Sequence, residues 1–207
     1  TRLNFAAKRT FDLAFSLVLL GLTAPLWLIA ALLIKLDSPG PVLYRQKRYG
    51  YKGRVFSAYK FRTMEEGAES KVQAVQGQSG PSGAFFKAKK DPRVTRVGRF
   101  LRRFSLDEFP QFINVLRREM SVVGPRPLAL TTGELERLEK DFGATAKKRM
   151  NILPGITGLW QVSGRSDVSS EQRFSLDLFY VEHWSLGMDL EIIIKTVPAV
   201  LFGKGAY

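Results

Sequence analysis

The longest apolar stretch of the chain runs from Leu13 to Leu36, and no charged residue occurs between Leu13 and Ile34. A straight helix over those uncharged residues would extend about 33 Å, close to the hydrocarbon thickness of a bilayer. Pro25 lies near the middle. Proline removes one helical hydrogen bond and crowds the preceding turn, so a bend is expected there. The pattern therefore predicts a membrane helix within residues 1–36, bent at Pro25.

Basic residues flank the apolar stretch on both sides, and positive charge favours the cytoplasmic face of a membrane. They are Arg2, Lys8 and Arg9 before it and Lys35, Arg45, Lys47 and Arg48 after it. A helix that bends at Pro25 and leaves on the face where it entered would keep both groups on one side, and the Thr23 hydroxyl could then take up the carbonyl freed at Gly21. An ordinary spanning helix with a proline kink is the alternative, and the sequence leaves both open.

The rest of the chain, residues 37–207, is long enough for one folded domain, and its pattern predicts a mixture of strands and helices. Residues 42–64 alternate in polarity, which favours a small β-hairpin. Apolar residues recur at helical spacing in three later segments, residues 105–116, 132–150 and 170–183. Residues 186–202 form an amphipathic to apolar segment, which we expect to lie on the bilayer surface as an interfacial helix. The expected fold class is α+β and mainly helical.

The charge balance predicts an anionic partner. The chain has 207 residues, with 32 Lys and Arg against 19 Asp and Glu, a net charge of +13. Nucleic acid, anionic lipid and phosphorylated substrates would all match such a charge. Next to a membrane helix, lipid headgroups and phosphates fit best. No cysteine is present, which excludes disulfides and thiolate metal sites. Because the chain begins at Thr1, we expect it to be part of a longer protein.

Two short motifs carry candidate chemistry. Asp107 and Glu108 follow Ser105, and a Ser with a Glu three residues later is typical of a capping box, so both acids could be purely structural. Alternatively, one carboxylate could act as a nucleophile and the other as a ligand of a divalent cation. Arg126 stands between two prolines in a rigid turn, which suits bidentate phosphate recognition, although an ordinary structural turn remains the alternative. A third segment, residues 151–165, is rich in glycine, which suggests a close approach of backbone to a ligand.

Six sequence blocks, in order and over almost the whole chain, resemble the bacterial sugar transferases, the monotopic phosphoglycosyl transferases of polysaccharide initiation. The blocks are KRTFDLAFSLVLL, KLDSPGPVLYRQKRYG, YKFRTM, RRFSLDEFPQFINVLRREMSVVGPRP, LPGITGLWQVSGR and LDLFYVEHWSLGMDL. The resemblance implies a re-entrant helix broken at a Ser-Pro pair. This chain has Ala24-Pro25 there, so the hydroxyl is shifted to Thr23 or replaced.

The resemblance also implies a reaction and its residues. Asp107 would attack the sugar-bearing phosphorus of a UDP-sugar, release UMP and carry a phosphosugar that undecaprenyl phosphate then removes. Glu108 would bind Mg²⁺. Arg102 matches the family arginine upstream of the acidic pair and is expected to hold phosphate, and Lys60 and Arg126 are further phosphate-binding candidates.

The resemblance implies a location on the cytoplasmic face of the bacterial inner membrane. The expected partners are the UDP-sugar, undecaprenyl phosphate, anionic membrane lipid and a second copy of the chain in a homodimer. A catalytically inactive membrane scaffold of the same fold is the main alternative. A nucleic-acid-binding module is disfavoured, because no helix-turn-helix, RNP or zinc pattern occurs and aromatic residues do not interleave with the basic run.

Overall fold

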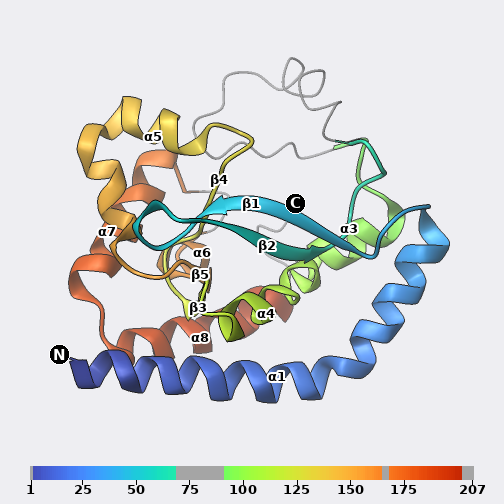
Figure 1. Ribbon diagram of the computed structural model, residues 1–207, viewed down its shortest axis with the longest axis horizontal. Coiled ribbons are helices and arrows are strands. Elements are labelled where there is room, and N and C mark those ends of the chain that lie inside the picture. Colours follow the sequence, from blue (N-terminus) through green and yellow to red (C-terminus); the bar gives the residue numbers. More distant parts are fainter. Residues whose placement is uncertain (1, 69–90, 165–167, 202–207) are drawn as a thin grey trace.

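The computed structural model describes residues 2–68, 91–164 and 168–201 (Figure 1). Most of the polar segment 65–78, the connector 77–83 and the basic residues 87–90 lie outside the described residues. Arg165 of the glycine-rich segment and the last six residues of the chain also lie outside them.

Helices of varied length surround two small sheets (Figure 1). The α-helices are α1 (Arg2–Asp37), α3 (Arg96–Arg103), α4 (Gln111–Leu116), α5 (Glu134–Phe142), α6 (Leu159–Val162), α7 (Ser170–His183) and α8 (Leu186–Leu201). The 3-10 helices are η1 (Tyr51–Gly53), η2 (Leu106–Glu108) and η3 (Gly143–Asn151). The strands are β1 (Leu43–Tyr49), β2 (Val55–Phe61), β3 (Ser121–Val123), β4 (Leu128–Ala129) and β5 (Gly155–Thr157). The predicted mainly helical α+β class is confirmed.

The apolar N-terminal segment forms one helix of 36 residues, α1, with Pro25 inside it. Figure 1 shows α1 running beneath the other elements and then turning toward the sheet in its later part. The sequence suggested that the Thr23 hydroxyl donates to the carbonyl freed at Gly21, but the structure shows a different acceptor. The hydroxyl donates instead to the carbonyl of Leu19, at 2.7 Å, and accepts from Trp27 Nε1 at 3.2 Å. In a helix the Thr hydroxyl lies near the carbonyl four residues earlier, here that of Leu19, and not near the carbonyl two residues earlier.

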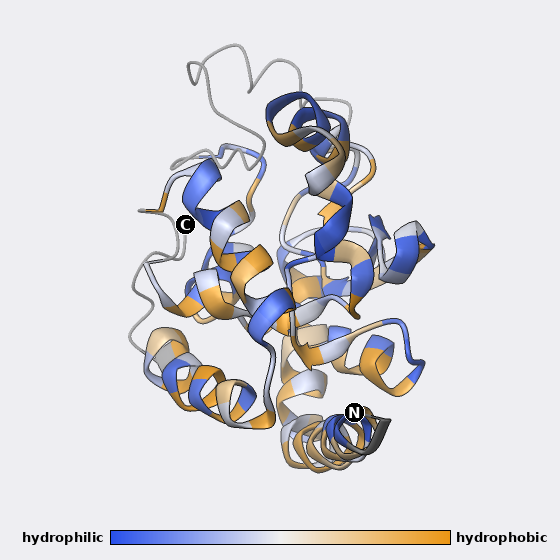
Figure 2. Cartoon of the chain, turned by 90° about the vertical axis from the view of Figure 1, so that its left-hand side faces the viewer, coloured by the Kyte–Doolittle hydropathy of each residue, from blue (hydrophilic) through white to orange (hydrophobic). Residues whose placement is uncertain are grey.

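The apolar surface of α1 faces away from the rest of the protein. Among the side chains of α1 that the structure describes, ten large apolar ones are exposed, including Leu17, Val18, Leu22, Leu28 and Leu36. Within the described residues, α1 is the helix long and apolar enough to cross a membrane, and only 11% of its apolar window is buried. Figure 2 shows this apolar helix along one edge of the molecule, opposite the more hydrophilic α5. Such exposure distinguishes α1 from the buried core helix of a soluble protein.

Both ends of α1 are fixed to the same folded body. Near its start, Lys8 Nζ pairs with Asp189 of α8 at 2.6 Å and donates to the carbonyl of Val123 at 3.1 Å. Asp12 accepts from the backbone N–H of Val122 at 3.0 Å. At its end, the Asp37 carboxylate accepts from the N–H of Val97 in α3 at 2.9 Å. These long-range contacts hold the two ends of the apolar helix against one unit.

The predicted hairpin is confirmed as β1 and β2, which pair antiparallel from Leu43 opposite Phe61 to Tyr49 opposite Val55. Strand β4 extends this sheet along β1, and β3 and β5 form a separate parallel pair. The main core lies between these sheets, α4, α7 and α8. Its buried residues are Phe56, Ala58, Phe112, Val115, Met120, Val122, Val123, Tyr180 and Ile192.

Two predicted helices are interrupted. The segment 105–116 is not one capped helix: η2 and α4 are separate, and Pro110 precedes α4. The segment 132–150 changes from α5 to η3 at Gly143, which has a φ of +58° that glycine adopts readily. The glycine-rich segment contains β5 and α6. A Cβ on Gly155 would lie 2.1 Å from the backbone nitrogen of Gly124, so close packing between backbones explains that glycine.

The helix predicted over 170–183 is confirmed as α7, with Phe174 buried. Asp177 of α7 is 1% exposed. Asp189 of α8 is buried to the same extent. Both acids have basic partners from distant segments, which makes their burial tolerable. Pro198 lies inside α8.

Candidate active site

Helix α3 is positioned by a cap and a close approach. The Thr95 hydroxyl caps the helix by accepting from the N–H of Gly98, at 3.0 Å. A Cβ on Gly98 would lie 2.1 Å from the carbonyl oxygen of Thr63, so only glycine lets α3 come this near to the end of the hairpin. The approach allows Arg102 Nε to donate to Thr63 Oγ1 at 2.9 Å. Arg102 is thereby held beside the end of the YKFRTM block.

The acidic pair lies in the short turn that follows α3. Ser105 has a left-handed backbone, with a φ of +53°, and its side chain makes no cap hydrogen bond, so the predicted capping box is wrong. The reason is that the Glu108 side chain turns to cations from other segments instead of back to Ser105. Asp107 is buried, with 8% of its surface exposed. The turn thus presents two adjacent carboxylates in a largely enclosed position.

Glu108 is held by two cations from different segments. Its Oε1 accepts from Lys60 Nζ of β2 at 2.7 Å. The same oxygen accepts from Arg126 Nη1 and Nη2 at 3.2 and 3.1 Å. Arg126 comes from the turn between β3 and β4. The site is therefore assembled from three segments that are up to 66 residues apart in sequence, as the difference between 126 and 60 gives.

The charges in the site are strongly coupled. Burial pushes the pKa of Glu108 upward, but the charges of Arg126 and Lys60 and their hydrogen bonds outweigh it, so the pKa lies well below its usual value. The charge of Glu108 raises the pKa of Arg126, against the effect of burial. Burial lowers the pKa of Lys60, and Glu108 opposes that change. Glu108 is consequently ionised throughout the range from pH 5 to 8.

Asp107 and Arg102 belong to the same electrostatic cluster. Burial lowers the pKa of Arg102, and the negative charge of Asp107 is the largest influence that opposes it. Asp107 likewise favours the charged forms of Lys60 and Arg126. The five site residues predicted from sequence therefore gather in one place. Two carboxylates among three cations form a site that can take up a diphosphate and attack it.

The donor set fits a divalent cation that arrives with a phosphorylated ligand. Among the described residues, no group of three or more His, Asp or Glu could hold a metal by protein ligands alone. Mg²⁺ is usually bound by one or two carboxylates together with substrate phosphates and water. Asp107 and Glu108 match this pattern, and only one Glu108 oxygen takes part in the hydrogen bonds to Lys60 and Arg126.

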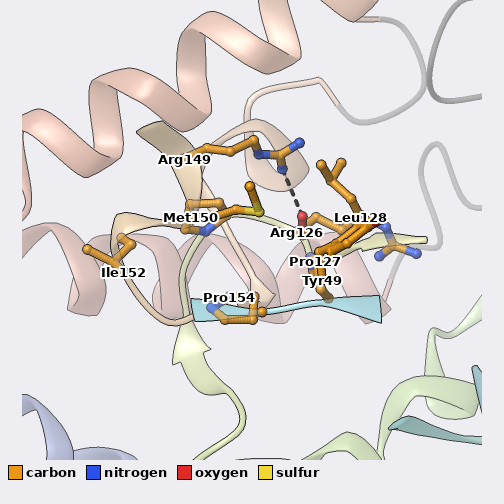
Figure 3. Close-up of a pocket in the computed structure, with 10 residues that line it drawn as sticks. Tyr49, Arg126, Pro127, Leu128, Arg149, Met150, Ile152 and Pro154 are labelled. Carbon is orange, nitrogen blue, oxygen red and sulfur yellow. Dashed lines mark hydrogen bonds between the residues drawn. The ribbon is translucent and has the colours of Figure 1, made fainter. Parts of the chain in front are cut away.

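Sequence reasoning missed the residues that support the Arg126 turn. Arg48 of β1 and Arg149 of η3 are buried and contact the backbone of this turn. Together with Met150 and Pro154, the turn lines a small pocket (Figure 3). The sequence did contain one signal: Asp177, the ion-pair partner of Arg149, falls on the same helix face as Phe174, where an acid requires a buried partner. His183 interacts through Nδ1 with the carbonyl oxygen of Phe179.

A model of the family described as bacterial sugar transferase matches residues 3–203. The chain belongs to this family. Among its relatives, the exopolysaccharide production protein ExoY of Rhizobium meliloti is 43% identical over 206 residues, which cover 97% of this chain and 88% of that protein. The UDP-glucose:undecaprenyl-phosphate glucose-1-phosphate transferase of Caulobacter vibrioides is also 43% identical, over 72% of its length. The undecaprenyl-phosphate galactose phosphotransferase of Salmonella typhimurium is 42% identical, and this sugar transferase spans only 41% of it.

Proposed function

We propose that this sugar transferase moves a sugar-1-phosphate, most simply a hexose-1-phosphate, from a UDP-sugar to undecaprenyl phosphate and thereby initiates assembly of a surface polysaccharide. The names of two relatives, an undecaprenyl-phosphate galactose phosphotransferase and a UDP-glucose:undecaprenyl-phosphate glucose-1-phosphate transferase, support the substrate classes. The observation that carries the proposal is the buried pair Asp107 and Glu108 among Lys60, Arg126 and Arg102.

In the proposed reaction a carboxylate oxygen of Asp107 attacks the phosphorus that bears the sugar. A bond forms between that oxygen and phosphorus, and the bond from phosphorus to the bridging oxygen breaks, so UMP leaves with the bonding electrons. A phosphate oxygen of undecaprenyl phosphate then attacks the same phosphorus and expels Asp107. The products are UMP and undecaprenyl diphosphosugar, and Asp107 is regenerated.

The surrounding cations stabilise the charge that this transfer moves. Lys60 and Arg126 both donate hydrogen bonds to Glu108. Both can also donate to a phosphate that binds beside Glu108. Arg102 interacts more strongly with the charge of Asp107 than with that of Glu108, and it can donate to a further oxygen of the diphosphate. Glu108, with Asp107, would hold Mg²⁺, which when bound neutralises part of the diphosphate charge. In this arrangement the cations are shared between Glu108 and the substrate.

We further propose that α1 is re-entrant, so that the protein is monotopic on the cytoplasmic face of the inner membrane. Lys8 and Asp37 lie at opposite ends of α1, yet both bind the same folded body. A straight span would draw these two ends to opposite faces of the bilayer. The exposed apolar surface of α1 would instead enter the membrane from one side and return. The interfacial position of α8, contacts with anionic lipid and the homodimer stay predictions.

Single cysteines test this topology, because the 207 residues of this chain include none. We expect Asn4→Cys, before the apolar stretch, and Arg54→Cys, after it, to react with a membrane-impermeant maleimide in inverted membrane vesicles and not in intact spheroplasts. Both positions are exposed in the folded chain. The cysteine-free parent provides the background. Labelling of the two positions from opposite sides of the membrane would rule out the re-entrant helix.

The transferase activity is tested by UMP release from a panel of UDP-sugars with undecaprenyl phosphate and Mg²⁺. We expect one UDP-hexose to support turnover and the release to depend on the lipid phosphate after the first turnover. The covalent intermediate predicts one equivalent of UMP per protein without the acceptor. If no UDP-sugar yields UMP while the protein is folded and membrane-bound, the proposed function is wrong.

A further inference from the structure

The backbone of the turn Pro125-Arg126-Pro127 accepts a hydrogen bond from outside the turn at each of its three carbonyl groups. Proline has no backbone N–H, so the two prolines offer no donors by which the rest of the protein could hold them. Each of the three carbonyls accepts a hydrogen bond from outside the turn: Pro125 from the N–H of Gly155 at 2.9 Å, Arg126 from Arg149 Nη2 at 2.8 Å, and Pro127 from Arg48 Nη1 at 2.6 Å. Two of the three donors are therefore guanidinium groups.

Arg149 is the more deeply buried of these two arginines. Its whole surface is 2% exposed, and its side chain forms an ion pair with Asp177 of α7, whose side chain is equally enclosed. Burial raises the pKa of Asp177 to about 6, and the charge of Arg149 opposes this rise, so the carboxylate is ionised at neutral pH. The same nitrogen, Nη2, donates to Asp177 and to the Arg126 carbonyl. Arg149 thus connects α7 to the turn.

The orientation of the Arg126 side chain depends on a fixed backbone, which the hydrogen bond from Arg149 helps to hold. Figure 3 shows the Arg149 guanidinium directed at the Arg126 carbonyl oxygen, while the Arg126 side chain extends away from Arg149. That side chain reaches Glu108 through both terminal nitrogens. A guanidinium fork recognises carboxylate or phosphate only in a narrow range of orientations, so a displaced backbone would misalign it.

We infer that Arg149, held by Asp177, is a positioning residue that fixes the Arg126 backbone and so aims its guanidinium at Glu108 and the substrate phosphate. Arg149 acts on Arg126 through the backbone carbonyl of that residue. The inference rests on the proposed function and adds to it a support that links α7 to the site. A buried ion pair is often no more stabilising than apolar residues of similar size. A carbonyl of the turn, in contrast, requires a donor, which an apolar pair could not supply.

A double-mutant cycle with Arg126 tests this role. In the wild-type background, Arg149→Met is expected to lower kcat/KM for the UDP-sugar by about 10- to 100-fold, the usual effect of a small displacement of a substrate-binding group. In the Arg126→Gln background the same substitution should lower kcat/KM less than about twofold, because the group that it positions is gone. The loss of Tm should be equal in both backgrounds. Equal losses of kcat/KM in both backgrounds would overturn the inference and leave Arg149 a purely structural residue.

Two further variants separate the effect of Arg149 on stability from its effect on the position of Arg126. The combined variant Arg149→Met, Asp177→Leu removes both charges, so we expect it to regain Tm relative to Arg149→Met but not kcat/KM. If its kcat/KM recovers together with Tm, the positioning role is wrong. Lys147→Met, on the same η3 helix, removes an exposed ion pair with Glu139 and should leave kcat/KM unchanged.

A binding measurement keeps this inference distinct from the proposed function. The same four proteins of the cycle are titrated with UMP by calorimetry. We expect Arg149→Met to weaken UMP binding in the wild-type background and not in the Arg126→Gln background. If the wild type binds UMP in this pattern but releases none from any UDP-sugar, the proposed function fails and the positioning role stands. An equal weakening in both backgrounds contradicts the positioning role whatever the activity.

Discussion

Asp107→Asn is expected to lower turnover at least about 1,000-fold, the scale of loss seen when a covalent nucleophile is removed. The amide keeps the size of the side chain and can still accept hydrogen bonds, but it cannot form the acyl phosphate on which the proposed reaction depends. Asp107 is 8% exposed and stands in the η2 turn, so this isosteric change leaves the packing around it intact. UMP release measures the rate, and retention of radiolabelled sugar-phosphate on the denatured protein measures the intermediate.

The control for this variant is Asp141→Asn, which removes an exposed carboxylate of α5 and should retain both turnover and label. An inactive scaffold predicts a different outcome, in which Asp107→Asn changes only thermal stability and the wild type never acquires label. Unchanged turnover by Asp107→Asn would remove the covalent mechanism. Turnover lost with label retained would place the nucleophile at another residue.

Local patterns in the sequence predicted the elements that are defined by a regular spacing of apolar residues. The hairpin and α7 both appear where alternation and helical spacing placed them, because each buries a regular apolar face. The same logic failed for residues 105–116. A Ser with a Glu three residues later matches a capping box, but Lys60 and Arg126 attract Glu108 more strongly than the backbone of Ser105 does. Tertiary charge therefore overrides a local capping signal.

The residues of the candidate site could be predicted from the sequence, but the buried ion pairs that hold the surrounding segments in place could not. Asp107, Glu108, Lys60, Arg102 and Arg126 are named by the family resemblance, and the fold gathers them. When two oppositely charged residues are far apart in the sequence, no local pattern shows which basic residue will form an ion pair with a given acid. The buried pairs of Arg149 with Asp177 and of Lys8 with Asp189 are of this kind. An acid on the apolar face of a helix is the one trace that such a pair leaves in the sequence.

Glu108→Gln should be the second most damaging of these substitutions, because Glu108 has two proposed roles. Its charge compensates Lys60 and Arg126, and an amide removes the carboxylate with which both cations form ion pairs. Its carboxylate is also a proposed ligand of Mg²⁺, and an amide oxygen binds this ion more weakly. Loss of an outer-shell partner of a metal costs about 10- to 100-fold in activity, so loss of a direct ligand is expected to cost at least about 100-fold.

The dependence on Mg²⁺ separates these two roles. With Glu108→Gln we expect half-maximal UMP release to need a higher Mg²⁺ concentration and sugar-phosphate label to form slowly, since Asp107 is still present. Glu136→Gln, an exposed acid of α5, provides the matched control. Because the pKa of Glu108 lies well below its usual value, the wild type keeps this carboxylate ionised as the pH falls from 8 to 5. The ratio of wild-type to variant activity should therefore stay constant over that range. An unchanged Mg²⁺ requirement in Glu108→Gln would mean that Glu108 only orients Lys60 and Arg126, and unchanged turnover would exclude both roles.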